Sequence, residues 1–223
     1  MRKSSLLRFA ALLLLLVTRA EMLQAQGGIG SGEAPDQRAV RDSFAAYKAA
    51  LMREDGRAAA PLVTEGTVRY YGRMRDLALK GQEAEVKQLS AMNKFIVLRM
   101  RHQVGLESLR NMSDEDMFVY GIDKGWTGKE SVAQAALGKI DVTGDVARSE
   151  VIEGGKLVAP KFTFRKEGER WKIDLTANFP TAELILKGMM KEWKMEEDAF
   201  IFETLEILSG KKVMPAVWQP LIK

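Results

Sequence analysis

Residues 139–176 read KIDVTGDVARSEVIEGGKLVAPKFTFRKEGERWKIDLT, and this stretch decides the fold. Three glycine-containing turns divide it into four short runs rich in Val, Ile, Phe and Trp: Thr143-Gly144-Asp145, Glu153-Gly154-Gly155 and Lys166-Glu167-Gly168-Glu169. Short apolar runs joined by tight glycine turns are typical of an antiparallel meander. We therefore predict a roughly four-stranded antiparallel sheet over 139–176.

The last of these runs alternates in character, as a strand with one buried face does. Trp171, Ile173 and Leu175 fall on one side, whereas Asp174 falls on the other with a lysine and a threonine. An antiparallel sheet with one apolar and one polar face carries helices on one side only. Helical patterns precede this sheet and follow it but do not interrupt it, so the predicted fold class is α+β.

Helical spacing is clearest near the start of the domain, where Val40, Phe44, Tyr47 and Leu51 recur every three or four residues. Asp36 follows a proline and is placed to cap this helix. The N-terminal helices are therefore predicted to pack on one face of the sheet.

Two further helices are predicted over 67–79 and 83–89, but residues 94–104 fit two structures. Apolar residues and His102 alternate there with Arg and Gln, as in a half-buried strand. Yet Ser90 is a good helix N-cap, and apolar residues also recur at helical spacing. We favour a helix.

The N-terminus has the pattern of a secretory signal peptide. A basic start precedes an unbroken apolar run at 9–17, which is too short to span a bilayer comfortably as a helix. Small residues then offer cleavage after Ala20 or after Ala25. We predict a signal peptide over 1–25, a flexible Gly-rich tether over 26–35, and export to the periplasm or the medium. A retained membrane anchor is the alternative.

Removal of this segment changes the electrostatic character of the chain. The sequence has 34 Lys and Arg against 30 Asp and Glu, and four of these basic residues lie in the first 20, which contain no acid. A mature chain starting at Glu21 is therefore formally neutral. That balance argues against nucleic-acid binding, which needs a clustered positive excess. The chain has no cysteine, so an exported domain would be stabilised by its core without disulfides.

Two helices and an apolar tail are predicted after the sheet, as an extension over 177–223 that packs on the domain. The first helix is expected to bury Ile185, Met189 and Trp193, and the second is expected to end at Gly210. The tail is too apolar to be free, and three of its residues are predicted to dock: Val217, Trp218 and Leu221.

Two segments together resemble the nuclear transport factor 2-like superfamily. The first is RDSFAAYKAALMREDGRAAAPLV at 41–63, and the second runs from DVTGDVARSEVI at 141–152 to FTFRKEGERWKIDL at 162–175. The resemblance covers 36–176 and implies a cone-shaped α+β domain, with helices packed in the concavity of a curved sheet. The long helical block before the sheet and the helices after it indicate an elaborated, exported bacterial branch.

The resemblance implies a range of functions rather than one. The superfamily includes isomerases, dehydratases and epoxide hydrolases, and also non-catalytic binding and assembly domains. Its enzymes use a carboxylate or histidine base with Tyr or Asp donors inside the cone. No residue of this chain matches those catalytic positions, so none is assigned a catalytic role. No cofactor is implied, and a single histidine without cysteine does not favour a metal site.

Four side chains are candidates for a ligand site. His102 is the only histidine and has an unperturbed pKa near neutrality. Asp174 is expected on the solvated side of the last strand, and it becomes an acid–base candidate if helices cover that side. Tyr71 is placed either to line a cavity or to pack in the core. Trp126 lies in a glycine-rich loop, where it could form a binding lip or plug the core.

These features give three hypotheses. The leading one is an exported, non-catalytic domain that binds a small apolar ligand or another protein of the cell envelope, with no membrane contact after the signal is removed. The second is an isomerase- or hydratase-type enzyme with Asp174 or His102 as base and a tyrosine as donor. The third is a structural protein that self-associates, as a homodimer, through its C-terminal helices.

Overall fold

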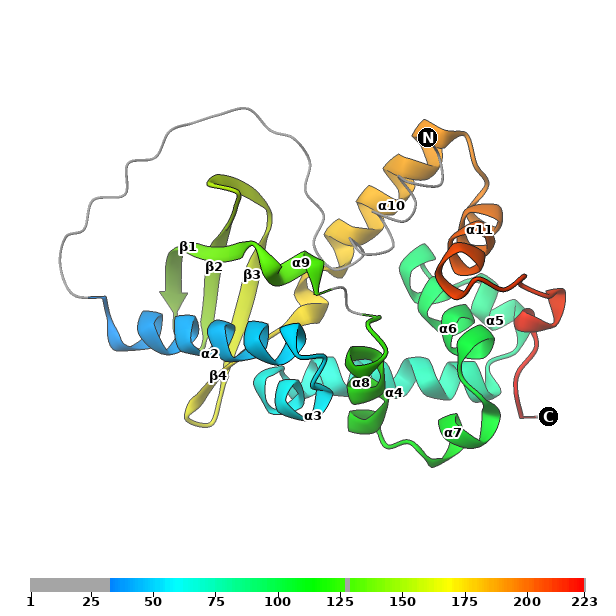
Figure 1. The fold of residues 1–223 in the computed structure, drawn as a ribbon, viewed down its shortest axis with the longest axis horizontal. Helices are drawn as coiled ribbons and strands as arrows, with labels where there is room; N and C mark the ends of the chain where they lie inside the picture. Colours follow the sequence, from blue (N-terminus) through cyan, green and yellow to red (C-terminus); the bar gives the residue numbers. More distant parts are fainter. Residues whose placement is uncertain (1–32, 127–128, 223) are drawn as a thin grey trace.

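A computed structural model describes residues 33–126 and 129–222, with no account of the side chains of 130, 131, 159 and 160. It confirms the α+β fold class: an antiparallel sheet is backed by an N-terminal helix, and further helices precede and follow it (Figure 1). The predicted signal peptide and most of the predicted tether lie outside the described residues.

The strands form one continuous block along the chain, with helices before it and helices after it. The helices before the sheet are α2 (Pro35–Met52), α3 (Gly56–Ala59), η1 (Ala60–Leu62), α4 (Glu65–Lys80), α5 (Glu83–Lys87), α6 (Ala91–Gln103), α7 (Leu106–Asn111), α8 (Asp114–Asp123) and α9 (Glu130–Ala133). The strands are β1 (Ala135–Thr143), β2 (Val146–Glu153), β3 (Lys156–Glu167) and β4 (Arg170–Ile173). The helices after the sheet are η2 (Leu175–Asn178), α10 (Phe179–Trp193), α11 (Glu197–Ser209) and η3 (Pro215–Trp218).

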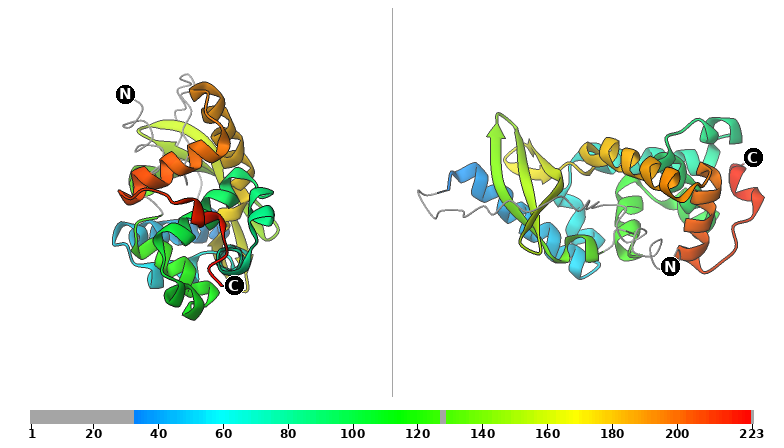
Figure 2. Two further views of the ribbon diagram at one scale, coloured as in Figure 1. Left: turned by 90° about the vertical axis from the view of Figure 1, so that its right-hand side faces the viewer. Right: turned by 90° about the horizontal axis from the view of Figure 1, so that it is seen from above.

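The sheet is the predicted meander, with strand order β1-β2-β3-β4 and antiparallel pairing throughout. Gly144, Gly154 and Gly168 take positive φ at its three turns, a conformation that is strained for other residues. The pairing register shifts once in β1 and once in β2, and such irregularities bend a sheet. The twist is visible from above in Figure 2.

Helix α2 packs across the sheet. We call the cluster of side chains buried around this contact the sheet-side core. The Phe44 and Phe162 rings lie 5.3 Å apart across this contact. Trp171, Ile173 and Leu175 are buried, as predicted. The predicted cap is wrong: α2 begins at Pro35, and the Asp36 carboxylate instead accepts hydrogen bonds from the Trp171 indole and the Lys166 ammonium. These side chains come from the far end of the sheet, so local sequence gives no sign of the contact.

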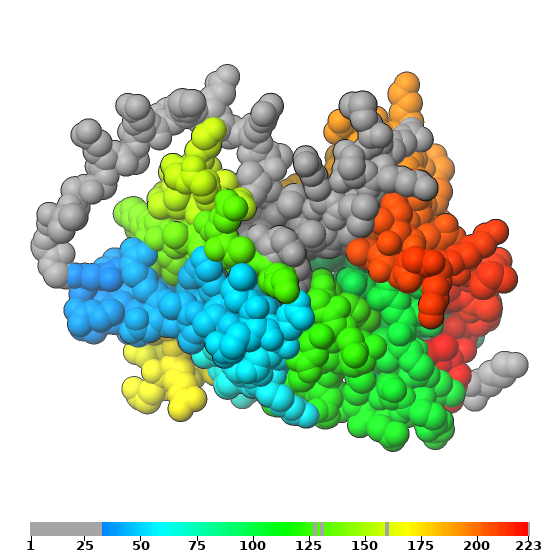
Figure 3. Space-filling view, in the orientation of Figure 1, coloured from blue at the N-terminus to red at the C-terminus, as the bar shows by residue number. Residues whose placement is uncertain are grey.

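A second, helical core lies beside the first. Its buried members come from α4, α6, α8, α10 and α11, and include Met74, Leu98, Met117, Leu186 and Phe200. In the space-filling view, the sheet-side helices and the helices of this core abut along the lower side of the molecule (Figure 3). Residues 94–104 are helical, as favoured, and α6 is buried on nearly all sides because both neighbouring segments and the C-terminal helices pack around it.

The C-terminal helices differ from prediction in one respect. Helix α10 buries Ala182, Leu186 and Met190, whereas the predicted Ile185, Met189 and Trp193 are only partly buried. The inward stripe is therefore rotated by one residue, because both rows are apolar and periodicity alone does not choose between them.

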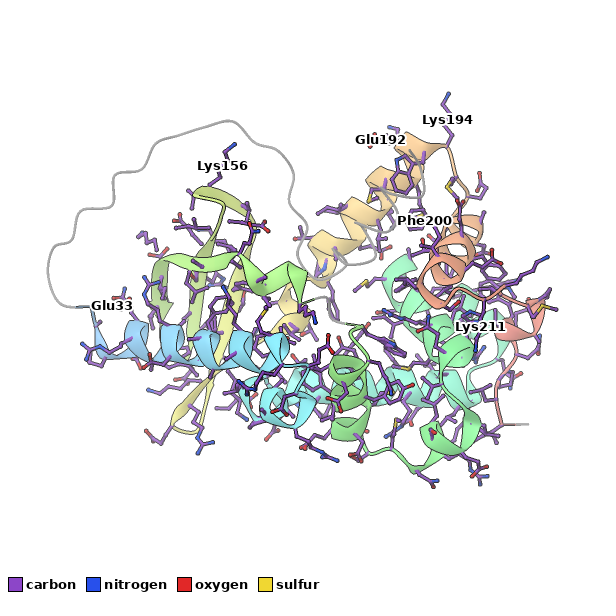
Figure 4. The ribbon with its side chains drawn as sticks, in the orientation of Figure 1. Glu33, Lys156, Glu192, Lys194, Phe200 and Lys211 are labelled. Atoms are coloured by element: carbon purple, nitrogen blue, oxygen red, sulfur yellow. The ribbon has the colours of Figure 1, made fainter. Side chains whose placement is uncertain are left out.

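The end of the chain is as predicted. Helix α11 ends at Gly210, which takes positive φ. Val217 and Trp218 are buried, and Leu221 packs against the helical core. By contrast, Lys156 and Lys194, at the turns before β3 and after α10, point outward from the body of the molecule (Figure 4).

One buried arginine joins α6 to two other parts of the chain. The guanidinium of Arg101 donates to the carbonyls of Leu77, Ala78 and Gly81, at the C-terminal end of α4, and to those of Val217 and Trp218 in the tail. The last carbonyls of a helix have no partner within it and carry partial negative charge, so a cation is favoured there. Arg101 therefore caps α4 and fixes the tail at once.

We expect Arg101→Met to lower the free energy of unfolding by about 3 kcal/mol or more, because it leaves several buried carbonyls without donors. Urea denaturation measures the loss. The control is Arg110→Met, since Arg110 is 56% exposed and lies 3.8 Å from its acidic partner; that change should stay within about 0.5 kcal/mol. Equal effects of the two substitutions would contradict this role for Arg101.

Two helical glycines differ in how closely other parts of the chain approach them. A Cβ added to Gly56, at the start of α3, would lie 2.5 Å from the Val119 carbonyl oxygen of α8. A Cβ added to Gly188, within α10, would meet nothing within 4 Å. The first glycine is required by packing and the second is not.

We therefore expect a glycine-to-alanine substitution to change the free energy of unfolding in opposite directions at the two positions. Gly56→Ala should destabilise the protein by roughly 1–3 kcal/mol through overpacking. Gly188→Ala should stabilise it by roughly 0.5–1 kcal/mol, because alanine is the better helix former. Thermal unfolding of both variants measures the difference, and a stabilising Gly56→Ala would refute the close contact between α3 and α8.

Candidate ligand-binding site

Helix α6 carries the positive charges that define the site. Its sequence, AMNKFIVLRMRHQ, contains Lys94, Arg99, Arg101 and His102 but no acidic residue. Its N-terminus is capped by the Ser90 hydroxyl and by the carboxylate of a glutamate on α10. Because α6 is buried, each of its cations has to find a partner on another element.

Two of the cations have complete partners. The Lys94 ammonium lies 2.6 Å from the Glu197 carboxylate and 3.4 Å from that of Asp198, both on α11. Arg101 is surrounded by the carbonyls described above. His102 is partly buried, and its Nε2 lies 2.8 Å from the Ser209 hydroxyl.

Arg99 is different. It is 9% exposed, and its Nε donates to the Gln103 side-chain oxygen at 3.2 Å. Its guanidinium carbon lies 4.5 Å from the centroid of the Trp126 ring, a cation–π contact. No acidic side chain within 33–126 or 129–222 forms an ion pair with it. Burial lowers the pKa of Arg99 to about 10, so the side chain remains charged at neutral pH.

Aromatic side chains from both cores meet at this arginine. Tyr71, on α4, packs against the sheet-side core and against the helical core. Its ring lies edge-on to that of Phe118, at 5.6 Å. The Tyr120 and Trp126 rings meet edge-on at 5.5 Å. Burial raises the pKa of Tyr71 to about 12, and the charge of Arg99 opposes this shift.

We call Tyr71, Arg99, Gln103, Tyr120 and Trp126 the junction cluster, because it lies where the two cores meet. Two buried polar atoms at or near it lack hydrogen-bond partners within the described part of the chain: Gln103 Nε2 and the Tyr47 hydroxyl. Burial raises the pKa of Tyr47, and Tyr71 adds to the shift. An unpartnered buried polar group costs about 1–3 kcal/mol, so such groups call for a functional explanation.

The structure brings together two of the four candidates named from the sequence. Tyr71 and Trp126 share Arg99 as a neighbour. His102 contacts α11 instead, and burial lowers its pKa. Asp174 lies directly after β4, between the sheet-side core residues Ile173 and Leu175, and not on α6.

The expectation that Asp174 faces solvent is wrong, because it is 6% exposed. One carboxylate oxygen accepts from the Thr176 hydroxyl and from the backbone N–H of Ala177, and so caps η2. The other accepts from the Arg165 guanidinium at 2.7 Å. Burial alone would raise the pKa of Asp174, but these hydrogen bonds outweigh it and hold the pKa below its usual value. Asp174 is thus a structural cap rather than a protonated acid.

Sequence reasoning missed Arg99, Gln103 and Tyr120. The alternation at 94–104 placed the arginines near His102 on the polar side of that segment, whereas Arg99 and Arg101 are buried. One signal was available: a helix with three cations, one histidine and no acid has no means of pairing its charges locally. In the described residues, no group of three or more His, Cys, Asp or Glu side chains could hold a metal ion. None of the helices among them has both the length and the apolar character needed to cross a membrane.

Comparison of the chain with models of protein families, with characterised proteins and with solved structures finds no match. The site is therefore interpreted from its own geometry.

The Asp174 cap predicts a pH dependence. Its folded pKa is depressed, so its stabilisation is present above the unfolded value of about 3.9 and is lost as pH falls through the folded value. We expect Asp174→Asn to cost about 1–2 kcal/mol at pH 7. The gap should close below about pH 4. Asp42→Asn, on the exposed side of α2, is the control. A gap independent of pH would contradict this account.

Proposed function

We propose that this chain is an exported, non-catalytic domain that binds a small, largely apolar ligand at the junction cluster. The observation that carries the proposal is the buried Arg99, with no acidic partner in the described structure, among aromatic side chains from both cores. Export is supported by the basic and apolar pattern of residues 1–25.

The cluster has the composition of a small-molecule site. Such sites are mostly apolar and aromatic, with a few polar groups that fix the orientation of the ligand. Tyr71 and Trp126 are partly buried rather than enclosed, and both belong to the layer of side chains that borders a core. The unpartnered Gln103 amide supplies a polar group that a ligand could satisfy.

Several observations favour binding over catalysis. General acid–base chemistry at neutral pH favours a carboxyl group with a raised pKa or a well-placed histidine. Asp174 has a lowered pKa and its oxygens are occupied, and His102 is held by Ser209 on α11. The junction cluster itself contains a cation, an amide and aromatic rings, but no base.

We further propose that residues 36–176 form a nuclear transport factor 2-like domain. The antiparallel sheet with α2 packed across one face supports this assignment, as does the resemblance of 41–63 and 141–175. In such a cone a ligand would enter between sheet and helices. Here α4, α6 and α8 provide every residue of the junction cluster except Trp126, which follows α8.

We expect saturable one-to-one binding of at least one compound from a panel of medium-chain and aromatic molecules, each with neutral, anionic and cationic head groups. Isothermal titration calorimetry with the full-length chain measures it. Tyr71→Ala and Trp126→Ala should each weaken the binding by about tenfold, since losing one buried aromatic contact costs ~1 kcal/mol or more. Leu184→Ala, at a side chain 71% exposed on α10, should have no effect. Absence of saturable binding across the whole panel would refute the proposed function.

A further inference from the structure

We propose that the ligand of the junction cluster is an apolar molecule with a single carboxylate, and that Arg99 binds this carboxylate. The inference rests on the proposed function and names the chemical class of its ligand. It follows from three properties of the cluster: its uncompensated charge, the hydrogen-bonding type of its free groups, and the apolar character of what surrounds them.

The uncompensated charge is that of Arg99. Buried arginines are nearly always paired, because removing a cation from water is costly. The two other buried cations of α6 follow this rule, since Lys94 has two carboxylates and Arg101 has five carbonyls. Arg99 uses only its Nε, toward Gln103. Within the described residues its two terminal nitrogens donate no hydrogen bond, and they are not among the fully buried atoms, so the planar fork that matches a carboxylate is open to a ligand.

The other free groups at the cluster are donors. Gln103 presents Nε2, because its oxygen already accepts from Arg99. The pKa of Tyr71 is about 12, so its hydroxyl is neutral at pH 7 and keeps its proton. A set of donors with one cation and no anion is complementary to an anionic acceptor.

The surroundings limit the ligand to one negative charge on an apolar body. Phe118, Tyr120 and Trp126 supply apolar and aromatic surface. Two additional cations, Arg73 and Lys124, are exposed and lie over the rings of Tyr70 and Tyr120 at 6.0 and 5.7 Å. One buried cation balances a carboxylate, whereas a phosphate monoester carries about −1.5 to −2 at neutral pH and would leave a surplus of negative charge.

The first experiment compares ligands that differ only in the head group. Dodecanoate, dodecanol, dodecylamine and dodecyl phosphate are titrated separately, below their micelle concentrations, into the full-length protein at pH 7.5. 4-Butylbenzoate and 4-butylbenzyl alcohol form an aromatic pair. We expect at least one carboxylate to bind roughly 10- to 100-fold more tightly than its matched alcohol, the range typical of a charge-assisted hydrogen bond.

The second experiment changes the protein. Arg99→Met should remove the preference for carboxylate over alcohol while leaving the alcohol affinity within about twofold. Arg99→Lys should keep part of the preference, because it retains the charge but not the fork. Arg73→Met is the matched control, since it removes an exposed cation over a tyrosine ring. Arg99→Met should fold at least as stably as the parent protein, because an apolar side chain replaces an unpaired buried charge.

The outcomes separate this inference from the proposed function. Equal binding of carboxylate and alcohol, or tighter binding of the amine or the phosphate, would overturn the inference and leave small-ligand binding intact. A carboxylate preference that survives Arg99→Met would overturn the role of Arg99. If no compound binds saturably, the proposed function itself fails. If Arg99→Met does not fold, the head-group comparison on the unmodified protein still decides the ligand class.

Discussion

The hydrogen bonds of Arg101 are the constraint on which the helical half of this protein depends. One guanidinium satisfies carbonyls at the end of α4 and in the tail, two segments more than 100 residues apart along the chain. A buried charge is costly unless its donors are used, and here every one of the contacts is to a backbone carbonyl. The result is that α6 cannot move without uncapping α4 and releasing the tail. Lys94 and the Glu183 cap fix the other end of α6 in the same way, to α11 and α10.

Because α6 is held rigidly, the side chain of Arg99 is held in its buried position. A flexible arginine would turn its head group to water, as long charged side chains do on most surfaces. Arg99 lies on a helix held at both ends, with Trp126 against its guanidinium, and remains 9% exposed. The same helix therefore shows two uses of a buried cation. Where partners are complete, as at Arg101, the cation organises the fold. Where the partners are incomplete, as at Arg99, the cation can still bind a ligand at the boundary between the two cores.

Local sequence signals predicted the elements of this fold well. Glycine turns divided the sheet correctly, the Ser90 cap marks the start of α6, and Gly210 ends α11. Each of these depends on residues within a few positions of one another. Predictions failed where a distant segment decided the outcome. Asp174 alternates with apolar residues like a solvated strand position, but Arg165 and the turn into η2 bury it. For the candidate site, Tyr71 and Trp126 were found as aromatics, while the arginine between them was read as surface because its burial depends on α6 being packed on all sides.

The free-energy cost of burying Arg99 without an acidic partner argues for a function more strongly than the chemistry of its side chain alone. Replacing a buried ion pair by apolar residues of similar volume is often neutral or stabilising, and an unpaired buried cation is less favourable still. A methionine at this position would fill similar space beside Trp126 and leave Gln103 able to turn. A chain that required only a stable helical core would gain from that change. The residues that break the rules of a well-packed interior tend to gather at functional sites. In the described part of this protein, a buried cation without an acidic partner and the unpartnered Nε2 of Gln103 lie one helical turn apart, against aromatic rings shared by both cores, and that coincidence is best explained by a ligand that completes them.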